Sequence, residues 1–232
     1  MAPKTIISYD GTNNEDDAIA LGRVFARAGA DVVLAYVRHT QEPEPDREQL
    51  AQEQAEALLV KGAELFGDTE VEREVVSDRS TPAGLRALAE RVGADVVVFC
   101  SDSHTAAGRV SVGNSAQRLL EGGPVAVAIA PAGLAEGGAD AVNRIAAVGD
   151  GADNDAAGTA SSLADALGAT VVPAADSAVD LLVVSSRPEA REGTVALSAA
   201  SENLIGEARC AVLVLPRGVQ LEFAGRAATV SA

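Results

Sequence analysis

The sequence contains little that would support several common kinds of site. Among its 232 residues there is no tryptophan, aromatic residues make up 3%, and cysteine and histidine occur only twice each. The two cysteines, Cys100 and Cys210, stand far apart, in runs that have the pattern of buried strands. We therefore expect two reduced thiols and no disulfide framework, which is typical of a protein from a reducing compartment.

Positive charge is also scarce. The chain has 18 Lys and Arg residues against 34 Asp and Glu residues, which gives a formal net charge of −16. A surface this acidic repels nucleic acid and anionic lipid, so neither is an expected partner. No apolar run reaches the ~18 residues that a membrane span needs, and no basic-plus-apolar leader is visible. We expect a soluble, cytoplasmic protein.

What the chain does have is a regular alternation of two patterns. Short apolar runs rich in valine and alanine alternate with amphipathic segments. The pattern predicts strands at 5–10, 31–37, 71–77, 95–100 and 124–131, and helices at 15–30, 47–67, 80–94 and from 114. Continuous apolar strands that alternate with helices are typical of a parallel sheet covered on both faces. The first part of the chain is therefore predicted to be an α/β domain with five strands.

The pattern then starts again in a shortened form. Asp10 and Asp150 end similar strands at an offset of 140 residues, whereas Asp95 and Asp180 begin similar strands at an offset of 85. The 55 residues by which the two offsets differ correspond to the long helix, the third strand and the helix after it. We interpret the chain as a tandem duplication. It has a first domain at 1–133, a flexible linker of small residues, a shortened second domain at 142–218 and a C-terminal tail at 219–232.

One loop carries the clearest functional signal. The stretch "CSDSHTAAGRVSVGNS", from Cys100 to Ser115, connects the fourth strand to the fourth helix. Such a loop is a common place for phosphate groups, because glycine lets backbone N–H groups approach phosphate oxygens closely. The corresponding loop of the second repeat, from Ser185 to Ser198, has the same length but is predicted to have lost every loop glycine.

A strand that ends in Asp-Gly, this loop, and a valine-rich fifth strand that ends in proline together resemble the universal stress protein family. Nucleotide-binding members of that family carry the motif G-x2-G-x9-G-[S/T] in the loop. Its four defined positions fall here on Cys100, Ser103, Gly113 and Asn114. Only Gly113 keeps the residue of the motif. The Cβ atoms of Cys100 and Ser103 are expected to narrow the loop and to weaken phosphate binding.

The resemblance implies a fold, a ligand and a set of site residues. The fold is two Rossmann-like repeats of the adenine nucleotide alpha hydrolase-like type, the first with a five-strand parallel sheet in the order 3-2-1-4-5 and the second truncated to four strands. The ligand is ATP or a related adenine nucleotide, accompanied by Mg²⁺ and by no other metal. The site residues are Asp10, Gly11, Thr12, Val37, Gly108, Gly113, Asn114 and Ser115. We expect at most one weak site, in the first repeat.

The resemblance implies a part in the stress response and leaves three kinds of function open. The first is a non-enzymatic module that responds to nucleotide. The second is an interaction or scaffold module that has lost nucleotide, which the missing glycines of the motif favour. The third is an enzyme, but no nucleophile–base pair, metal cluster or acid–base set is visible, and the acidic stretch "YDGTNNEDD" would repel phosphate. We therefore expect no enzymatic activity.

The fifth strands of the two repeats are predicted to be sheet edges whose free backbone groups need a partner. In the family, such strands pair antiparallel across a dimer. The resemblance therefore implies that the strands at 125–130 and 211–215 pair within the chain, as an intramolecular pseudo-dimer. A homodimer of the whole chain is a further expectation.

Overall fold

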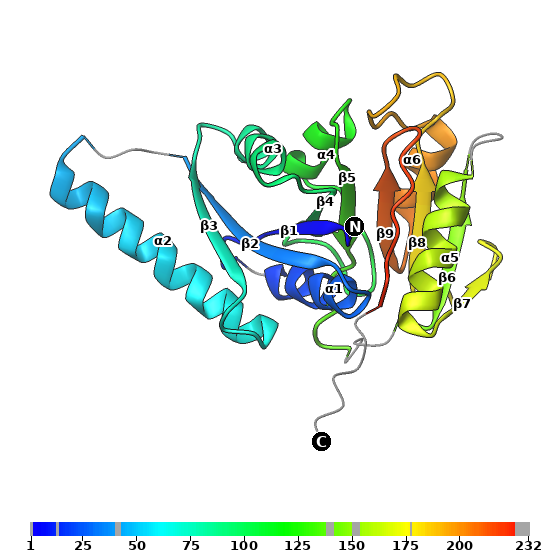
Figure 1. Ribbon diagram of the computed structural model, residues 1–232, viewed down its shortest axis with the longest axis horizontal. Coiled ribbons are helices and arrows are strands. Elements are labelled where there is room, and N and C mark those ends of the chain that lie inside the picture. Colours follow the sequence, from blue (N-terminus) through cyan, green and yellow to red (C-terminus); the bar gives the residue numbers. More distant parts are fainter. Residues whose placement is uncertain are drawn as a thin grey trace.

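The computed structural model describes residues 2–12, 14–39, 43–137, 142–149, 154–176 and 178–225. These residues form one nine-stranded sheet with helices on both of its faces (Figure 1). The elements of the first repeat are β1 (Lys4–Ser8), α1 (Glu15–Arg27), β2 (Asp31–Arg38), α2 (Pro45–Phe66), β3 (Glu72–Ser77), α3 (Thr81–Val92), β4 (Val96–Cys100), α4 (Asn114–Leu120) and β5 (Ala126–Ala130). Those of the second repeat are β6 (Arg144–Val148), α5 (Asp155–Leu167), β7 (Thr170–Val172), β8 (Leu181–Ser185), α6 (Ala199–Glu207) and β9 (Ala211–Leu215).

The strand order confirms the architecture expected from the sequence. The sheet runs β3-β2-β1-β4-β5-β9-β8-β6-β7, so the first repeat follows the order 3-2-1-4-5. The second repeat contributes four strands, and within the described residues the long helix, the third strand and the next helix have no counterpart there. Neighbouring strands are parallel except β5 and β9, which pair antiparallel. The chain is thus an α/β protein of two Rossmann-like repeats, the second shortened.

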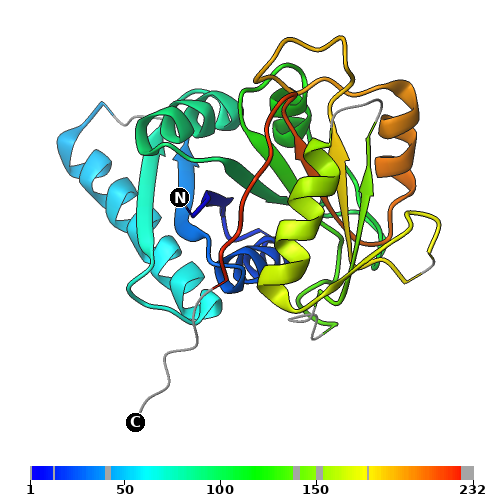
Figure 2. The same cartoon turned by 45° about the vertical axis from the view of Figure 1, so that its right-hand side comes forward.

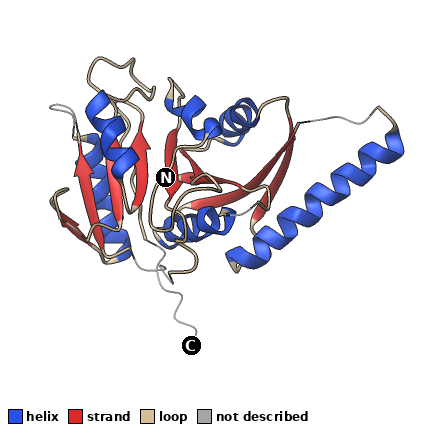
Figure 3. Cartoon of the chain, turned by 180° about the vertical axis from the view of Figure 1, so that it is seen from behind, coloured by secondary structure: helices blue, strands red, loops and turns tan. Residues whose placement is uncertain are grey.

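The alternation of side chains along the buried strands divides the core into two layers. In β4, Val96 and Val98 belong to the cluster that α1, α2 and α5 cover, whereas Val97 and Phe99 belong to the cluster that α3, α4 and α6 cover. Successive side chains of a strand point to opposite faces, so a strand buried on both faces is apolar at every position. Figure 3 shows helices on either side of the sheet.

The two repeats meet along an approximate two-fold axis. In the antiparallel pair, Val127 lies opposite Val214, and Ile129 lies opposite Val212. Val127 and Val212 are counterparts in the two repeats, as are Ile129 and Val214, because each pair is 85 positions apart. The two strands therefore contact each other through the same set of counterpart positions, as the two subunits do in an isologous dimer contact.

Two backbone hydrogen bonds outside the sheet repeat the same symmetry. The N–H of Val110 donates to the carbonyl of Ala208 over 3.2 Å, and the N–H of Val195 donates to the carbonyl of Gly123 over 2.9 Å. Val110 and Val195 are counterparts, and so are Gly123 and Ala208. The loop before the fourth helix in each repeat is thereby joined to the segment before the fifth strand of the other repeat.

The helix α2 has no counterpart in the second repeat. In the first repeat it packs beside α1, where the Arg23 guanidinium donates to the carbonyl of Leu65 over 3.2 Å. Its far end extends away from the sheet (Figures 1 and 3). The second repeat leaves the matching face of α5 without a helix, and the C-terminal segment 219–225 covers that face instead (Figure 2).

The C-terminal segment is joined to both repeats. The N–H of Leu221 donates to Thr159 Oγ1 over 2.9 Å, and the N–H of Phe223 donates to Ser162 Oγ over 2.7 Å, both on α5. The ring of Phe223 stacks on Phe25 of α1, with 6.0 Å between the ring centroids. The described part of the predicted tail is therefore an ordered element of the core, and the remainder, 226–232, lies outside the described residues.

The predicted linker is also ordered over its described part. Residues 132–137 form turns, and the backbone N–H groups of Gly133 and Ala135 each donate to the Asp17 carboxylate over 2.8 Å. The expectation of a flexible linker is wrong for these residues, because a buried carboxylate at the start of α1 fixes two of their amides. Residues 138–141 lie outside the described residues.

Among the described residues, no helix combines the length and the apolar character that crossing a membrane requires.

Candidate functional site

A cavity of about 310 Å³ lies at the carboxyl ends of β1 and β4. The strand order reverses between these two strands, and open α/β sheets bind ligands at such switch points. The residues that line the cavity are Ser8, Asp10, Thr12, Glu15, Thr81, Phe99, Cys100, Ser101, Asp102, Ser103, Gly113, Asn114, Ser115 and Ala116. The loop from Cys100 to Ser115, which the sequence analysis identified, therefore borders this cavity.

The structure brings together five of the eight residues that the sequence assigned to a site. The residues that line the cavity are Asp10, Thr12, Gly113, Asn114 and Ser115, and those that do not are Gly11, Val37 and Gly108. The side chain of Val37 is buried against α3, where its Cγ1 would lie 2.9 Å from a Cβ placed on Gly84. The N–H of Gly108 is bound to the carbonyl of Ala132 over 2.7 Å.

Gly11 lies in the turn after β1, next to the cavity residues Asp10 and Thr12. Its φ of +75° favours glycine, and a Cβ at this position would lie 2.5 Å from Leu58 Cδ1 on α2. The Asp10 carboxylate accepts a hydrogen bond from the N–H of Thr12 over 2.9 Å, which closes the turn after β1. Asp10-Gly11-Thr12 is therefore a tight turn with one carboxylate at the edge of the cavity.

Glu15 is the most unusual residue of this site, and the sequence analysis did not assign it. Its side chain is only 6% exposed, and its Oε2 accepts hydrogen bonds from the N–H groups of Asp10 and Gly11, the latter over 2.7 Å. Burial, together with the nearby Asp10 carboxylate, raises the pKa of Glu15 to about 9. An acidic residue in the first turn of a helix is usually a surface charge, so the sequence pattern does not indicate this burial.

Asp102 is a second acidic group that the sequence analysis did not assign. Its carbonyl accepts a hydrogen bond from the Asn14 side-chain amide over 3.0 Å, which ties the loop after β4 to the start of α1. Among the described residues Asn14 is the only non-glycine with positive φ, at 75°, a conformation that asparagine tolerates better than most residues. Asp102 Oδ1 would lie 2.9 Å from a Cβ on Gly113. A carboxylate therefore lies directly against the start of α4.

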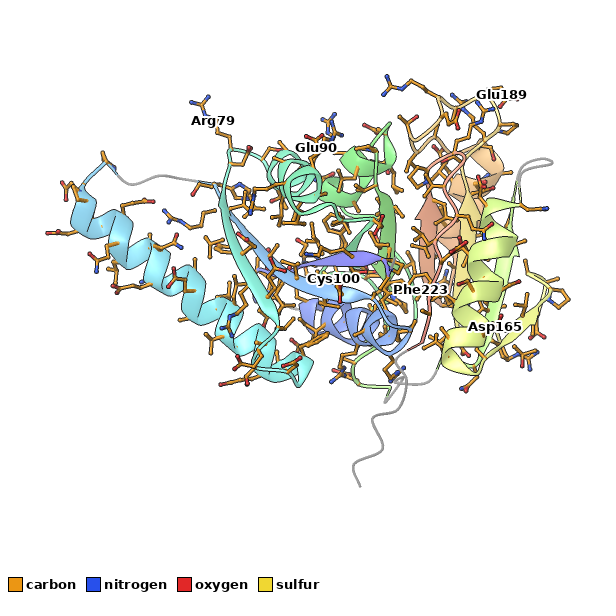
Figure 4. The ribbon with its side chains drawn as sticks, viewed as in Figure 1. Arg79, Glu90, Cys100, Asp165, Glu189 and Phe223 are labelled. Atoms are coloured by element: carbon orange, nitrogen blue, oxygen red, sulfur yellow. The ribbon has the colours of Figure 1, made fainter. Side chains whose placement is uncertain are left out.

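Cys100 and Ser103, which stand at two glycine positions of the family motif, both line the cavity. Neither has a positive φ, so the backbone there adopts a conformation open to any residue. Cys100 is labelled in Figure 4. Burial raises the pKa of its thiol to about 12, which keeps the thiol neutral. Their side chains occupy space at the cavity wall, as the sequence predicted.

The charge of the cavity does not suit a triphosphate. Three lining residues, Asp10, Glu15 and Asp102, carry carboxyl groups, and no lysine or arginine is among the lining residues. Phosphate sites in proteins combine backbone N–H groups with positive charge. Here Glu15 already takes the N–H groups of Asp10 and Gly11. The hydroxyl and amide groups of the wall are suited to the hydroxyl groups and ring edges of an uncharged ligand.

The matching loop of the second repeat keeps the framework of the first. Ser101 and Ser186 are counterparts, and each hydroxyl donates over 2.7 Å to the carbonyl of the last residue of the neighbouring fifth strand. The prediction that this loop lost its glycines needs a correction, because Gly193 corresponds to Gly108 and both have φ of +72°. Asp150, the counterpart of Asp10, lies outside the described residues.

The fold and the cavity at its switch point define a Rossmann-like α/β protein built from a complete and a shortened repeat. The model of the universal stress protein family matches residues 1–131, more than half of the 232 residues. The chain belongs to the universal stress protein family.

Solved structures show the same fold over almost the whole chain. A universal stress protein from Archaeoglobus fulgidus DSM 4304 is 15% identical, with a TM-score of 0.67, and the match covers 94% of this chain and 100% of that one. A putative universal stress protein from Pseudomonas aeruginosa UCBPP-PA14 is 12% identical, with a TM-score of 0.58, and the match covers 92% and 93% of the two chains. At these identities the likeness concerns the fold alone. No curated protein matches the sequence.

Proposed function

We propose that the chain is a non-enzymatic, ligand-responsive module of the stress response, with at most one weak adenine-nucleotide site, in the first repeat. Membership of the universal stress protein family supports the part in stress. The observation that carries the ligand site is the cavity at the switch point, which gathers Asp10, Thr12 and the three residues from Gly113 to Ser115. The acidic composition fits a cytoplasmic module that binds neither nucleic acid nor membrane.

The pairing of β5 with β9 supports a second part of the proposal. In this chain the edge strand of one repeat is covered by the edge strand of the other. We propose that this contact takes the place of a homodimer contact, so that one chain is an intramolecular pseudo-dimer. If two whole chains associate, they do so through another surface, because the backbone groups of β5 are already paired on both sides.

The alternative is an interaction or scaffold module that binds no nucleotide. The carboxyl groups of the cavity and the loss of motif glycines favour this alternative, because both weaken an anion site. Incubation with adenosine, AMP and ATP distinguishes the candidates. Turnover would indicate an enzyme, saturable binding without turnover would indicate the proposed module, and neither would indicate a scaffold.

A pair of glycine variants ties any binding to the cavity. Gly113→Leu places a side chain at the cavity wall, and the backbone there has φ of −69°, which leucine adopts readily. Its Cβ would lie 2.9 Å from Asp102 Oδ1, so the Asp102 side chain has to move aside. Gly206→Leu is the matched control, because Gly206 lies in α6 of the second repeat and an added Cβ meets nothing within 4 Å. We expect Gly113→Leu to abolish saturable binding and Gly206→Leu to retain it. Equal binding by both variants would place the site elsewhere.

A further inference from the structure

We propose that the cavity of the first repeat selects an uncharged nucleoside over a nucleoside triphosphate, and that Asp102 is the residue that excludes the phosphates. This inference rests on the proposed function, because it names the ligand class of the same site. It arises from a disagreement between the family motif, which binds phosphate, and the charges that line this cavity.

The position of Asp102 is the first support. Its Oδ1 lies against Gly113, the one motif glycine that this chain keeps. The side-chain amide of Asn14 donates to the Asp102 backbone carbonyl over 3.0 Å, which ties this loop to the start of α1. A phosphate group that approached Gly113 would therefore meet the Asp102 carboxylate. Asp102 is exposed, so water screens its repulsion of a phosphate, which is still of the same order as the net gain from one backbone hydrogen bond.

The second support for the inference is that the backbone N–H groups after β1 are already hydrogen-bonded. The N–H groups of Asp10 and Gly11 face a carboxyl group of the protein itself, that of Glu15, rather than an open cavity. An incoming anion would have to displace this buried side chain, which is 6% exposed. Among the described residues that line the cavity, there is no lysine or arginine to offset the cost.

The remaining wall suits a nucleoside. In dinucleotide sites of other parallel sheets, a carboxylate accepts hydrogen bonds from ribose hydroxyl groups, and Asp10 offers that chemistry here. The hydroxyls of Thr12, Thr81 and Ser115 add groups that both donate and accept. An uncharged ligand uses these partners without meeting the repulsion that a triphosphate meets.

Calorimetry with adenosine, AMP and ATP tests the inference, with and without Mg²⁺. We expect the natural protein to bind adenosine at least ~10-fold more tightly than ATP alone, with AMP between them. Added salt should strengthen ATP binding, because it screens repulsion, and should leave adenosine binding unchanged. Binding of ATP that is as tight as that of adenosine, or that weakens with salt, overturns the inference and leaves the proposed function standing.

Two variants separate the local carboxylate from the overall negative charge. Asp102→Asn should tighten ATP binding by about threefold or more and leave adenosine binding unchanged. Asp165→Asn, on α5 of the second repeat, changes net charge equally and should change neither (Figure 4). Equal effects of the two variants would overturn the assignment to Asp102. If neither adenosine, AMP nor ATP binds the natural protein, the proposed function fails, and this inference fails with it.

Discussion

Ala128 of β5 lies directly opposite Leu213 of β9, and these two residues are each other's counterparts, 85 positions apart in the two repeats. The approximate two-fold axis therefore passes between them. Both side chains are fully buried in the core layer that α1 and α5 share. A single core that contains residues of both repeats should make the repeats unfold together.

Leu213→Ala tests this coupling. We expect the variant to lower the free energy of unfolding by about 2–5 kcal/mol, because it leaves a cavity in the shared core. Both tyrosines, Tyr9 and Tyr36, lie in the first repeat, so tyrosine fluorescence reports that repeat, whereas far-UV circular dichroism reports both. The substitution, although in the second repeat, should move the urea midpoints of both signals by the same amount. Val171→Ala, at an exposed position of the outer strand β7, should move neither.

Independent unfolding of the two repeats would give a different result. The circular dichroism midpoint of Leu213→Ala would then fall while the tyrosine midpoint stayed in place. Such a separation would show that β5 and β9 pair without joining the two cores.

The C-terminal segment should contribute to stability as a helix would. Phe223→Ala removes the ring that stacks on Phe25 between the two repeats, and we expect a loss of about 3–5 kcal/mol in urea denaturation (Figure 4). Glu222→Ala is the neighbouring control, because that side chain is exposed, and it should cost less than about 0.5 kcal/mol. Similar stabilities of the two variants would contradict the claim that the segment closes the core of the second repeat.

Much of the fold could be predicted from the sequence, and the reasons are physical. Strands buried on both faces require unbroken apolar runs, so β4 and β9 stand out in the sequence. A duplication keeps a constant offset, so the missing segment of the second repeat could be located. The packing of the C-terminal segment on α5 could not be predicted. It depends on Leu221 and Phe223, and the residues that they contact lie far away in the chain.

The residues that form the cavity wall were predicted better than the acidic groups that give the cavity its charge. Motif positions located Gly113, Asn114 and Ser115 at the cavity. The burial of Glu15 and the placement of Asp102 depend on the left-handed backbone of Asn14 and on how two loops meet. Such contacts follow from tertiary structure and leave no periodic signal in the sequence.

Glu15 should give the protein a specific dependence on pH. The folded protein holds the Glu15 proton up to about pH 9, because burial disfavours the charge, whereas the unfolded chain releases it near its ordinary value of 4.5. Its contribution to stability is therefore complete below pH 4.5 and is lost as the pH rises toward 9. Over that window the natural protein should lose up to about 1.4 kcal/mol per pH unit relative to Glu15→Gln, which keeps the uncharged form.

Urea denaturation at pH 6, 7 and 8 measures this difference. Asp16→Asn is measured beside it as the control for removing a charge from the same helical turn, because Asp16 is exposed. A difference between Glu15→Gln and the natural protein that does not change with pH would mean that Glu15 is ionised in the folded protein.

Both cysteines should be free and slow to react. Burial raises the pKa of Cys100 to about 12 and that of Cys210 to about 11, and the thiolate is the reactive form. We expect a chromogenic disulfide reagent to modify both thiols at least ~100-fold more slowly in the folded protein than in urea at the same pH. Titration in urea without reductant should count two thiols. Fewer than two, or rapid reaction in the folded protein, would contradict this prediction.

The last prediction concerns the two lost glycines of the motif. Cys100→Gly with Ser103→Gly removes two Cβ atoms from the cavity wall, but the backbone at both positions already has ordinary φ values, and the Asp102 carboxylate remains. We therefore expect the double variant to gain less than about threefold in ATP affinity by calorimetry, and the triple variant with Asp102→Asn to gain more than the two changes separately. This coupling is the signature of a carboxylate that blocks the space the glycines open. If the double variant alone binds ATP as tightly as the triple variant, the Cβ atoms were the whole obstacle and Asp102 was not part of it.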